Sequence, residues 1–316
     1  MRGRISFRQG AIQHIYQNTV DGVLIFYSVR DFLVFFTTFA TVSRHYDIRI
    51  LGICLMFDHI HLLVEARNKA CLDRFVSHYT SWFVRQYNEW YGLKGSLFNR
   101  AYGLASKVSD KDIRSAIAYL YNNPVERRLC LRAEQSRWNF LAFGERPYPF
   151  SSPIRLDKAR APMRRAVEEV KISRKDERPL NYAQLKRITR HLTPAEQQQL
   201  TDFAISTYNC IDYQDLIYRF DDYGSLLTAL STTTGNEHGL KETFVGRSDK
   251  IYQQMTTFLL ESHCISNPDD LLRMPLEKRR ELFEPLWIWS GVSRRQVEKY
   301  LHLPEGAGGQ ITDNQR

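Results

Sequence analysis

The sequence has only five cysteines in 316 residues, and no two of them form a Cys-x-x-Cys pair. This spacing excludes zinc ribbons and disulfide frameworks, so a bound metal would need histidine, carboxylate or amide ligands. No apolar run approaches the roughly 18 residues that a membrane helix needs. The start, Met1 to Arg4, does not lead into the apolar core of a signal peptide. We therefore expect a cytoplasmic protein with no membrane partner.

Charge is distributed unevenly along the chain. Residues 1–150 carry 20 Lys and Arg against 12 Asp and Glu, residues 151–179 carry 9 against 5, and residues 180–316 carry 15 against 18. A basic front half indicates a polyanionic partner, with nucleic acid as the first choice. A merely basic, solvated surface would give the same counts, so charge alone is weak evidence.

Composition and proline placement predict two domains. Hydrophobic residues make up 43% of the chain and charged residues 25%, which is typical of globular proteins. Prolines and charged residues are dense between Pro147 and Pro179. We expect a front domain at 1–150, a basic linker at 151–179, a helical accessory domain at 180–304 and a disordered tail at 305–316.

The front domain has mixed periodicity, whereas the rest of the chain has helical patterns. Period-two alternation and helical spacing together predict an α+β fold of the ferredoxin-like (RRM-like) type, with an antiparallel sheet. The expected strands are 11–19, 23–27, 48–56, 59–65 and 101–108, and the expected helices are 32–45, 72–90 and 110 to a stop at Asn122-Asn123-Pro124.

The segment Asp58-His59-Ile60-His61 carries the strongest local signal for chemistry. Side chains alternate along a strand, so His59 and His61 share one face. Two imidazoles on one face make half of a divalent-metal site. A coincidental pair on a solvated strand is equally frequent for this short motif taken alone.

A second motif lies in the segment Tyr119-Leu120-Tyr121-Asn122-Asn123-Pro124. Tyr119 and Asn123 are four residues apart, so a helix places a phenol and an amide on the same face. Separately, a half-buried core tyrosine and a helix-terminating asparagine would explain the two residues as well.

Taken together, the two motifs resemble the single-tyrosine HUH transposases, particularly the insertion-sequence-200-like and REP-associated tyrosine transposases. The resemblance covers about residues 5–150 and includes the segment 97–102, the sequence 123–127 and Trp138. It implies a DNA transposase that cleaves and transfers single strands.

The resemblance also implies roles for individual residues. His59, His61 and Asn123 would bind a divalent metal, Mg²⁺ or Mn²⁺, and Tyr119 would be the nucleophile. Tyr121, two residues on, would face elsewhere on the helix. A phenol has a pKa near 10 and is a poor nucleophile, so a metal beside it would help by stabilising charge on the phosphate. The product would be a 5′-phosphotyrosine and a free 3′-hydroxyl.

The expected substrate is single-stranded or hairpin DNA. Arg100, Lys107 and Arg114 would bind phosphates, and nearby Trp82 and Trp90 would stack on bases unless they belong to the core. A homodimer with shared active sites is compatible with the sequence.

The region 281–303 resembles a helix-turn-helix, with a break at Gly291 and a second helix after Ser293. Arg294, Arg295 and Gln296 would then lie where base edges are usually read. A helical hairpin for protein contact is nearly as good an interpretation. Two other functions stay open: a non-catalytic DNA-binding regulator, and a replication-initiating HUH nickase, which would more often carry a second catalytic tyrosine.

Overall fold

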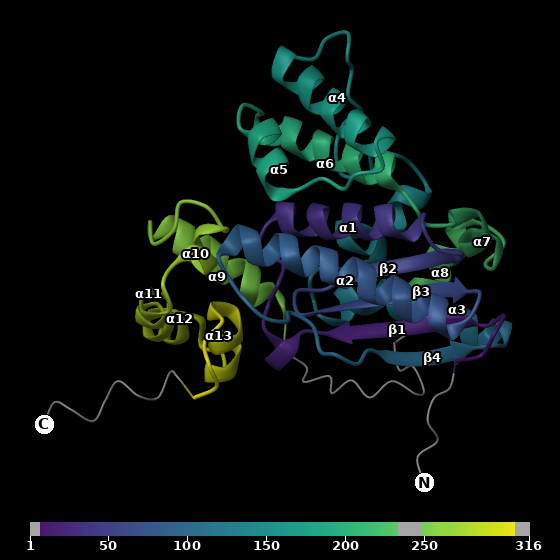
Figure 1. Cartoon of the computed structure of the whole chain (residues 1–316), viewed down its shortest axis with the longest axis horizontal. Coiled ribbons are helices and arrows are strands. Elements are labelled where there is room, and N and C mark those ends of the chain that lie inside the picture. The colour runs from purple at the N-terminus through teal and green to yellow at the C-terminus, as the bar shows by residue number, and fades with distance from the viewer. Residues whose placement is uncertain (1–6, 233–247, 307–316) are drawn as a thin grey trace, which may run out of the picture.

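The computed structural model describes residues 7–232 and 248–306. The front part forms a four-stranded antiparallel sheet in the order β2-β3-β1-β4 (Figure 1). Its strands are β1 (Ile12–Asn18), β2 (Ile48–Leu55), β3 (His59–Ala66) and β4 (Gly103–Lys107). The α+β prediction is confirmed.

The pairing of β1 with β3 determines which side chains share a face of the sheet. Tyr16 lies opposite His61, and His14 lies opposite Leu63. Since opposite residues in an antiparallel pair point to the same face, His14, Tyr16 and His61 lie on one side. The residues between them, such as Ile15 and Ile60, point to the other side.

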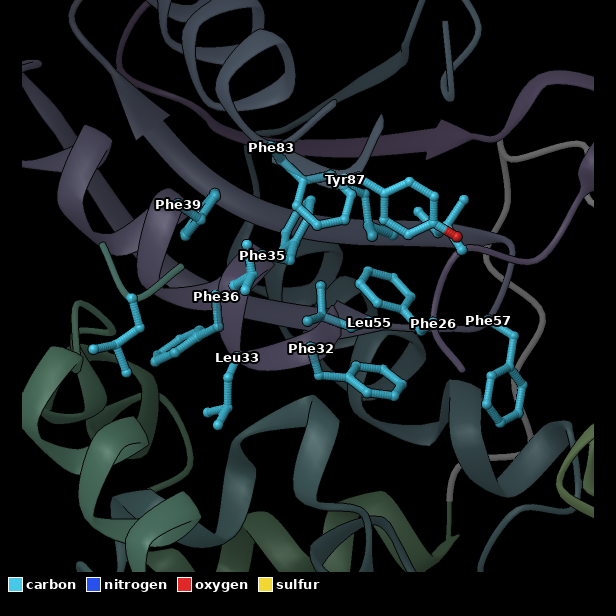
Figure 2. Close-up of a cluster of buried hydrophobic side chains, with 14 of the residues drawn as sticks. Phe26, Phe32, Leu33, Phe35, Phe36, Phe39, Leu55, Phe57, Phe83 and Tyr87 are labelled. Atoms are coloured by element: carbon cyan, nitrogen blue, oxygen red, sulfur yellow. The ribbon is translucent and has the colours of Figure 1, made fainter. Parts of the chain in front are cut away.

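Helices α1 (Val29–Ser43) and α2 (Lys69–Tyr91) cover the Ile15 face with an aromatic core (Figure 2). Phe35 and Phe83 lie edge to face, with ring centroids 5.0 Å apart. Complete burial of each such ring contributes about 1.5–3 kcal/mol to stability. Helix α1 begins at Ser28, whose backbone N–H donates to the Asp31 carboxylate at 2.8 Å.

Helix α3 (Asp110–Glu126) covers the opposite face and packs in a second core with Leu51 and Leu63. The predicted stop at Asn122-Asn123-Pro124 is wrong, because the helix continues through Pro124 to Glu126. Proline removes one N–H donor, but the carbonyl of Pro124 still accepts from Leu129 N at 2.9 Å. The last turn is therefore bonded despite the proline.

Residues 23–27 are extended but form no strand of the sheet, so that prediction is wrong. Their backbone bonds with other parts of the chain. Leu24 N donates to Lys299 O at 3.4 Å, and Ile25 N donates to Phe57 O at 2.8 Å. The segment thus connects the turn before β3 to the last helix.

Behind the front domain, the described residues are mainly helical, as predicted, and their helices form three groups. Helices α5 and α6 pack on α1, and α4 packs on α5 and α6. Helices α7 and α8 lie on the α3 side, and α9 to α13 gather beside the ends of α1 and α2 (Figure 1). Their bounds are α4 Ala161–Lys175, α5 Tyr182–Thr189, α6 Pro194–Tyr208, α7 Tyr213–Tyr218, α8 Tyr223–Thr232, α9 Lys250–Glu261, α10 Asp270–Arg273, α11 Leu276–Glu281, α12 Phe283–Ser290 and α13 Arg294–Leu301.

The expected linker at 151–179 contains the regular helix α4. Its buried residues Met163, Ala166, Val167 and Val170 have the spacing of one helix face and pack towards α6. Charged residues occupy most of the other positions of the helix. The composition of the segment is therefore that of a linker, although one helix face is apolar. The predicted tail at 305–316 falls mostly outside the described residues. Within the described ranges, no helix has the length and apolar character needed to span a bilayer.

Candidate active site

Strand β3 presents His59 and His61 to helix α3. Both side chains are buried, and their ring centroids are 5.1 Å apart. The alternation predicted for the Asp58-His59-Ile60-His61 segment holds, because Ile60 lies in the opposite core, beneath α1 and α2.

Helix α3 brings Asn123 between the two histidines. Its Oδ1 lies 3.4 Å from His59 Nε2, and its Nδ2 lies 3.1 Å from His61 Nε2. Residues separated by about 60 positions in sequence therefore meet at one point. The Oδ1 and Nδ2 positions of an amide are assigned from such contacts, so either atom can face either ring.

The other ring nitrogen of each histidine is also bonded. His59 Nδ1 lies 2.6 Å from Asp58 Oδ1, and His61 Nδ1 lies 3.2 Å from His14 Nε2. These contacts fix the orientation of both rings and turn both Nε2 atoms towards Asn123. This is the arrangement that metal-binding histidines usually have, with one nitrogen facing the ion and the other held by a polar neighbour.

Electrostatics favours a neutral His61 and an ionised Asp58. Burial, together with His59, His14 and Arg127, lowers the pKa of His61 well below its usual value. Burial alone would raise the pKa of Asp58, but the hydrogen bond and charge of His59, with Arg127 and Lys299, lower it overall. A neutral imidazole keeps a lone pair available for a metal ion.

The donor set fits a divalent metal. Two neutral imidazole nitrogens and one amide oxygen suit first-row metals such as Mn²⁺, while Mg²⁺ prefers more oxygen ligands. In the described part of the chain, no three His, Cys, Asp or Glu side chains form a metal-binding group. The amide of Asn123, which lies near both Nε2 atoms, is the third group of this set.

Tyr119 lies beside this cluster, and Tyr121 does not. The Tyr119 ring is 5.5 Å from the His61 ring and 5.7 Å from the His14 ring, between centroids. The Tyr121 hydroxyl instead donates to Leu51 O at 3.3 Å, inside the second core. Of the two tyrosines, Tyr119 is therefore the one whose ring lies beside the histidines.

The front-domain cations expected to bind DNA have different positions. Asn99 N donates to Asn18 O, and Asn18 lies opposite His59, so the exposed Arg100 borders the histidine end of the sheet. Lys107 is buried on β4, opposite Ile12 on the face that α3 covers. Arg114 is exposed on α3, with its guanidinium 5.4 Å from the Phe220 ring centroid.

The three residues expected to read bases make contacts within the protein. Arg294 stacks on Trp287 at 4.6 Å, and Arg295 Nη2 donates to Asp21 O at 2.9 Å. Gln296 is 9% exposed and its Oε1 caps its own helix at Ser293. Helices α12 and α13 do form the expected pair around Gly291, but α13 is docked on the front domain.

Sequence reasoning missed His14 and gave Asp58 no role. Nothing local distinguishes His14, a lone histidine on β1, since only the register between β1 and β3 places it against His61. Asp58 directly precedes the two histidines, so its position was available as a signal. Sequence reasoning also did not indicate that Tyr16 lies opposite His61. The Tyr16 ring packs so closely on Gly103 that a Cβ on residue 103 would lie 1.8 Å from it.

Comparisons with known proteins find similarity in the front part of the chain. Residues 30–123 match the model of the family described as "Transposase IS200 like", a range that contains both histidines, Tyr119 and Asn123. Among solved structures, the chain is similar to the REP-associated tyrosine transposase bound to a REP hairpin. The two share 15% identity and a TM-score of 0.36, covering 44% of this chain and 81% of that one. No curated protein matches. Over residues 30–123, the chain is therefore similar to the IS200-like transposase family.

Proposed function

We propose that this protein is a metal-dependent transposase that cleaves single-stranded DNA with Tyr119 and transfers the cut strand. The match of residues 30–123 to the IS200-like transposases supports a DNA-cleaving enzyme. The observation that carries the mechanism is the meeting of Tyr119 with His59, His61 and Asn123 on the α3 side of the sheet.

In this mechanism, His59, His61 and Asn123 hold a divalent ion, Mn²⁺ or Mg²⁺. When bound, the ion supplies positive charge that polarises the scissile phosphate and stabilises the charge that develops on it. Asp58 and His14 keep the two rings in the orientation that turns both Nε2 atoms inward.

Tyr119 performs the covalent step. Its phenolic oxygen forms a bond to phosphorus, and the bond from phosphorus to the 3′ oxygen of the upstream nucleotide breaks. The phenol proton passes to solvent, and the departing 3′ oxygen takes up a proton. The downstream strand is left as a 5′-phosphotyrosine. A 3′-hydroxyl can later attack this linkage in the reverse sense, so strands are exchanged with no external energy source.

The substrate is single-stranded or hairpin DNA, because the nucleophile must reach a backbone phosphate from a mostly buried position. Tyr119 is 7% exposed and His61 is completely buried. Arg100, at the histidine end of the sheet, is placed to bind a phosphate next to the cleaved one. A homodimer with shared sites stays a prediction.

Two alternatives are less well supported. A DNA-binding regulator without catalysis does not require two buried histidines whose Nδ1 atoms are both held by polar neighbours, whereas a metal site does. A replication nickase more often uses a second tyrosine, and the one two residues along the same helix, Tyr121, donates to Leu51 O.

The test is incubation of 3′-labelled single-stranded DNA with protein and Mn²⁺ or Mg²⁺, followed by a denaturing gel. Wild type should form a covalent adduct, and Tyr119→Phe should form none while binding DNA with nearly unchanged affinity. Tyr121→Phe is the matched control, because it removes the same atom two residues away and should retain the adduct. Adduct formation by Tyr119→Phe would eliminate Tyr119 as the nucleophile.

A further inference from the structure

A basic groove lies on the side of the sheet away from Tyr119. It runs between α2, the start of α5 and Arg273 of α10, and has a volume of about 630 Å³. A second hollow of about 460 Å³ shares four of its lining residues, Arg178, Asn181, Ala183 and Gln184, and extends it towards α4. The groove therefore exists only where the front domain meets the rear helices.

Cations in this groove outnumber anions. Arg85, Arg178 and Arg273 line it, against the single carboxylate of Glu89. Arg178 pairs with the exposed Asp176 at 2.7 Å. Within the described ranges, Arg85 and Arg273 have no carboxylate partner. Two arginines without a counter-charge, gathered in one concave surface, are suited to bind phosphates.

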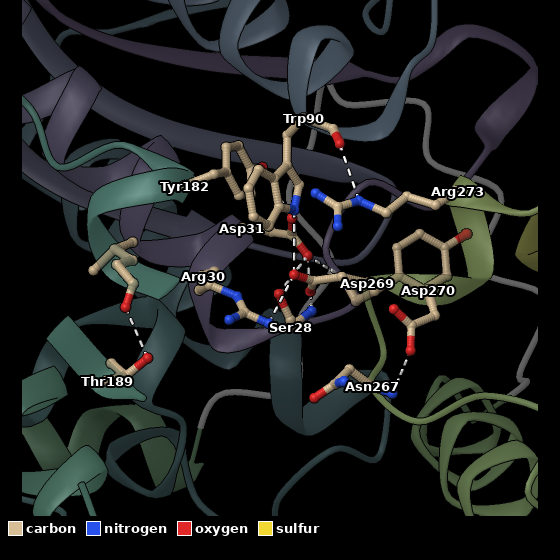
Figure 3. Close-up of polar contacts among 12 residues, drawn as sticks. Ser28, Arg30, Asp31, Trp90, Tyr182, Thr189, Asn267, Asp269, Asp270 and Arg273 are labelled. Carbon is tan, nitrogen blue, oxygen red and sulfur yellow. Dashed lines mark hydrogen bonds and ion pairs between the residues drawn. The ribbon is translucent and has the colours of Figure 1, made fainter. Parts of the chain in front are cut away.

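The groove contains two tryptophans, and one of them, Trp90, is held in place by its neighbours. Trp90 stacks on Tyr182, with ring centroids 5.3 Å apart, and Arg273 lies 3.9 Å from its ring centroid (Figure 3). Its Nε1 donates to Asp269 at 3.2 Å. Asp269 is buried and also pairs with Arg30 at 2.7 Å. The Asp269 carboxylate is therefore paired with Arg30 and Trp90 and does not neutralise the arginines that line the groove.

The other tryptophan is available to a ligand. Trp82 lines the groove, is partly exposed and stacks at 13° on His78, with ring centroids 5.9 Å apart. An indole beside arginines is the combination that single-stranded nucleic acid uses, with a base on the ring and phosphates on the cations. An acidic peptide would satisfy the arginines but would have no particular use for the indole.

We propose that this groove binds a single-stranded DNA segment that is not the one being cleaved. Arg85, Arg178 and Arg273 bind its phosphates, and a base stacks on Trp82. The sheet separates the groove from Tyr119, so the bound segment reaches the active site only by passing around the protein. The proposal rests on the proposed function for the identity of the nucleic acid, and it gives the rear helices a role in holding DNA.

The test compares full-length variants by fluorescence anisotropy with a long single-stranded oligonucleotide at several salt concentrations. The double variant Arg85→Gln with Arg178→Gln should reduce the salt dependence of binding by about 1.4 in log–log slope, since each lost phosphate contact on a single strand contributes about 0.7. Trp82→Ala should weaken binding at least about fivefold. Arg146→Gln, an exposed arginine outside the groove, is the matched control and should bind like wild type.

Covalent adduct formation on a short oligonucleotide separates this proposal from the proposed function. The groove variants should form as much adduct as wild type, because Tyr119 and the histidines are unchanged. Unchanged affinity and salt slope in the double variant would overturn the groove proposal and leave the transposase proposal standing. An equal loss of affinity for duplex DNA would overturn the single-strand assignment. Absence of adduct in wild type would instead contradict the catalytic proposal.

Discussion

His14 offers the sharpest test of how the candidate metal site is held together. His14→Ala removes the nitrogen that lies 3.2 Å from His61 Nδ1, both side chains being completely buried. If His61 uses Nε2 for a metal ion, its Nδ1 carries the hydrogen and donates to His14. The substitution then removes the acceptor that lies beside a buried N–H and one of the contacts that fix the orientation of the ring.

The size of the effect follows from these two losses. A buried donor deprived of its acceptor costs about 1–3 kcal/mol. Part of this cost is relieved if His61 turns, but a turned ring no longer directs Nε2 towards Asn123. Changes to groups that orient metal-binding histidines typically weaken metal binding about 10- to 100-fold. We expect a loss of Mn²⁺ affinity in this range for His14→Ala.

The assay is calorimetric titration of Mn²⁺ into full-length protein that carries Tyr119→Phe, so that no chemistry contributes heat. His14→Gln, which retains an acceptor, should recover a large part of the affinity. Circular dichroism checks that both variants are folded. If His14→Ala folds and binds Mn²⁺ as tightly as the protein with His14 intact, His14 does not position His61, and the reasoning fails.

Three further predictions concern the frame around the site. Burial lowers the pKa of His302 to about 4; protonation therefore favours the unfolded chain, and stability should fall as pH drops from about 6.5 to 4. His302→Gln should reduce this acid-dependent loss of unfolding free energy by roughly 1–2 kcal/mol, since the ring is partly exposed. Urea unfolding at several pH values measures it, and an equally steep pH dependence in the variant would show that His302 is not the cause. Gly103→Ala would place a Cβ 1.8 Å from the Tyr16 ring and should lower the unfolding free energy by about 1–3 kcal/mol, whereas an unchanged melting temperature would contradict this packing. The isolated fragment 1–150 should bind a hydrophobic dye and melt below the full chain, because the surfaces of α1 that α6 covers become exposed; a fragment as stable as the full chain would contradict this view.

Local sequence signals predicted most of the front domain. Alternating side chains identified four strands of the sheet, and helical spacing identified α1, α2 and α3. The failures have tertiary causes. Residues 23–27 have the composition of a strand, but their backbone bonds with Lys299 and Phe57, and no local pattern reveals partners so far along the chain.

The candidate site was predicted to the extent that it lies in two short motifs. His59 and His61 share a strand, and Tyr119 and Asn123 share a helix face, so periodicity alone pairs each set. His14 belongs to neither motif and depends on strand register. The charged residues of α13 could not be assigned either, because their contacts with Asp21 and Trp287 exist only in the folded chain.

The docking of α13 on residues 21–27 has a consequence for how the enzyme is made. The Tyr27 hydroxyl donates to Tyr300 O at 2.5 Å, a contact across 273 residues, and Ile25 N bonds to Phe57 O beside Asp58. At about 5–20 residues per second, a ribosome needs roughly 15–55 s to synthesise the intervening chain. Throughout that interval, the segment that bonds to the turn before His59 lacks its contacts with α13. A nascent chain therefore completes the frame around the candidate site only after the ribosome has made residues 294–301.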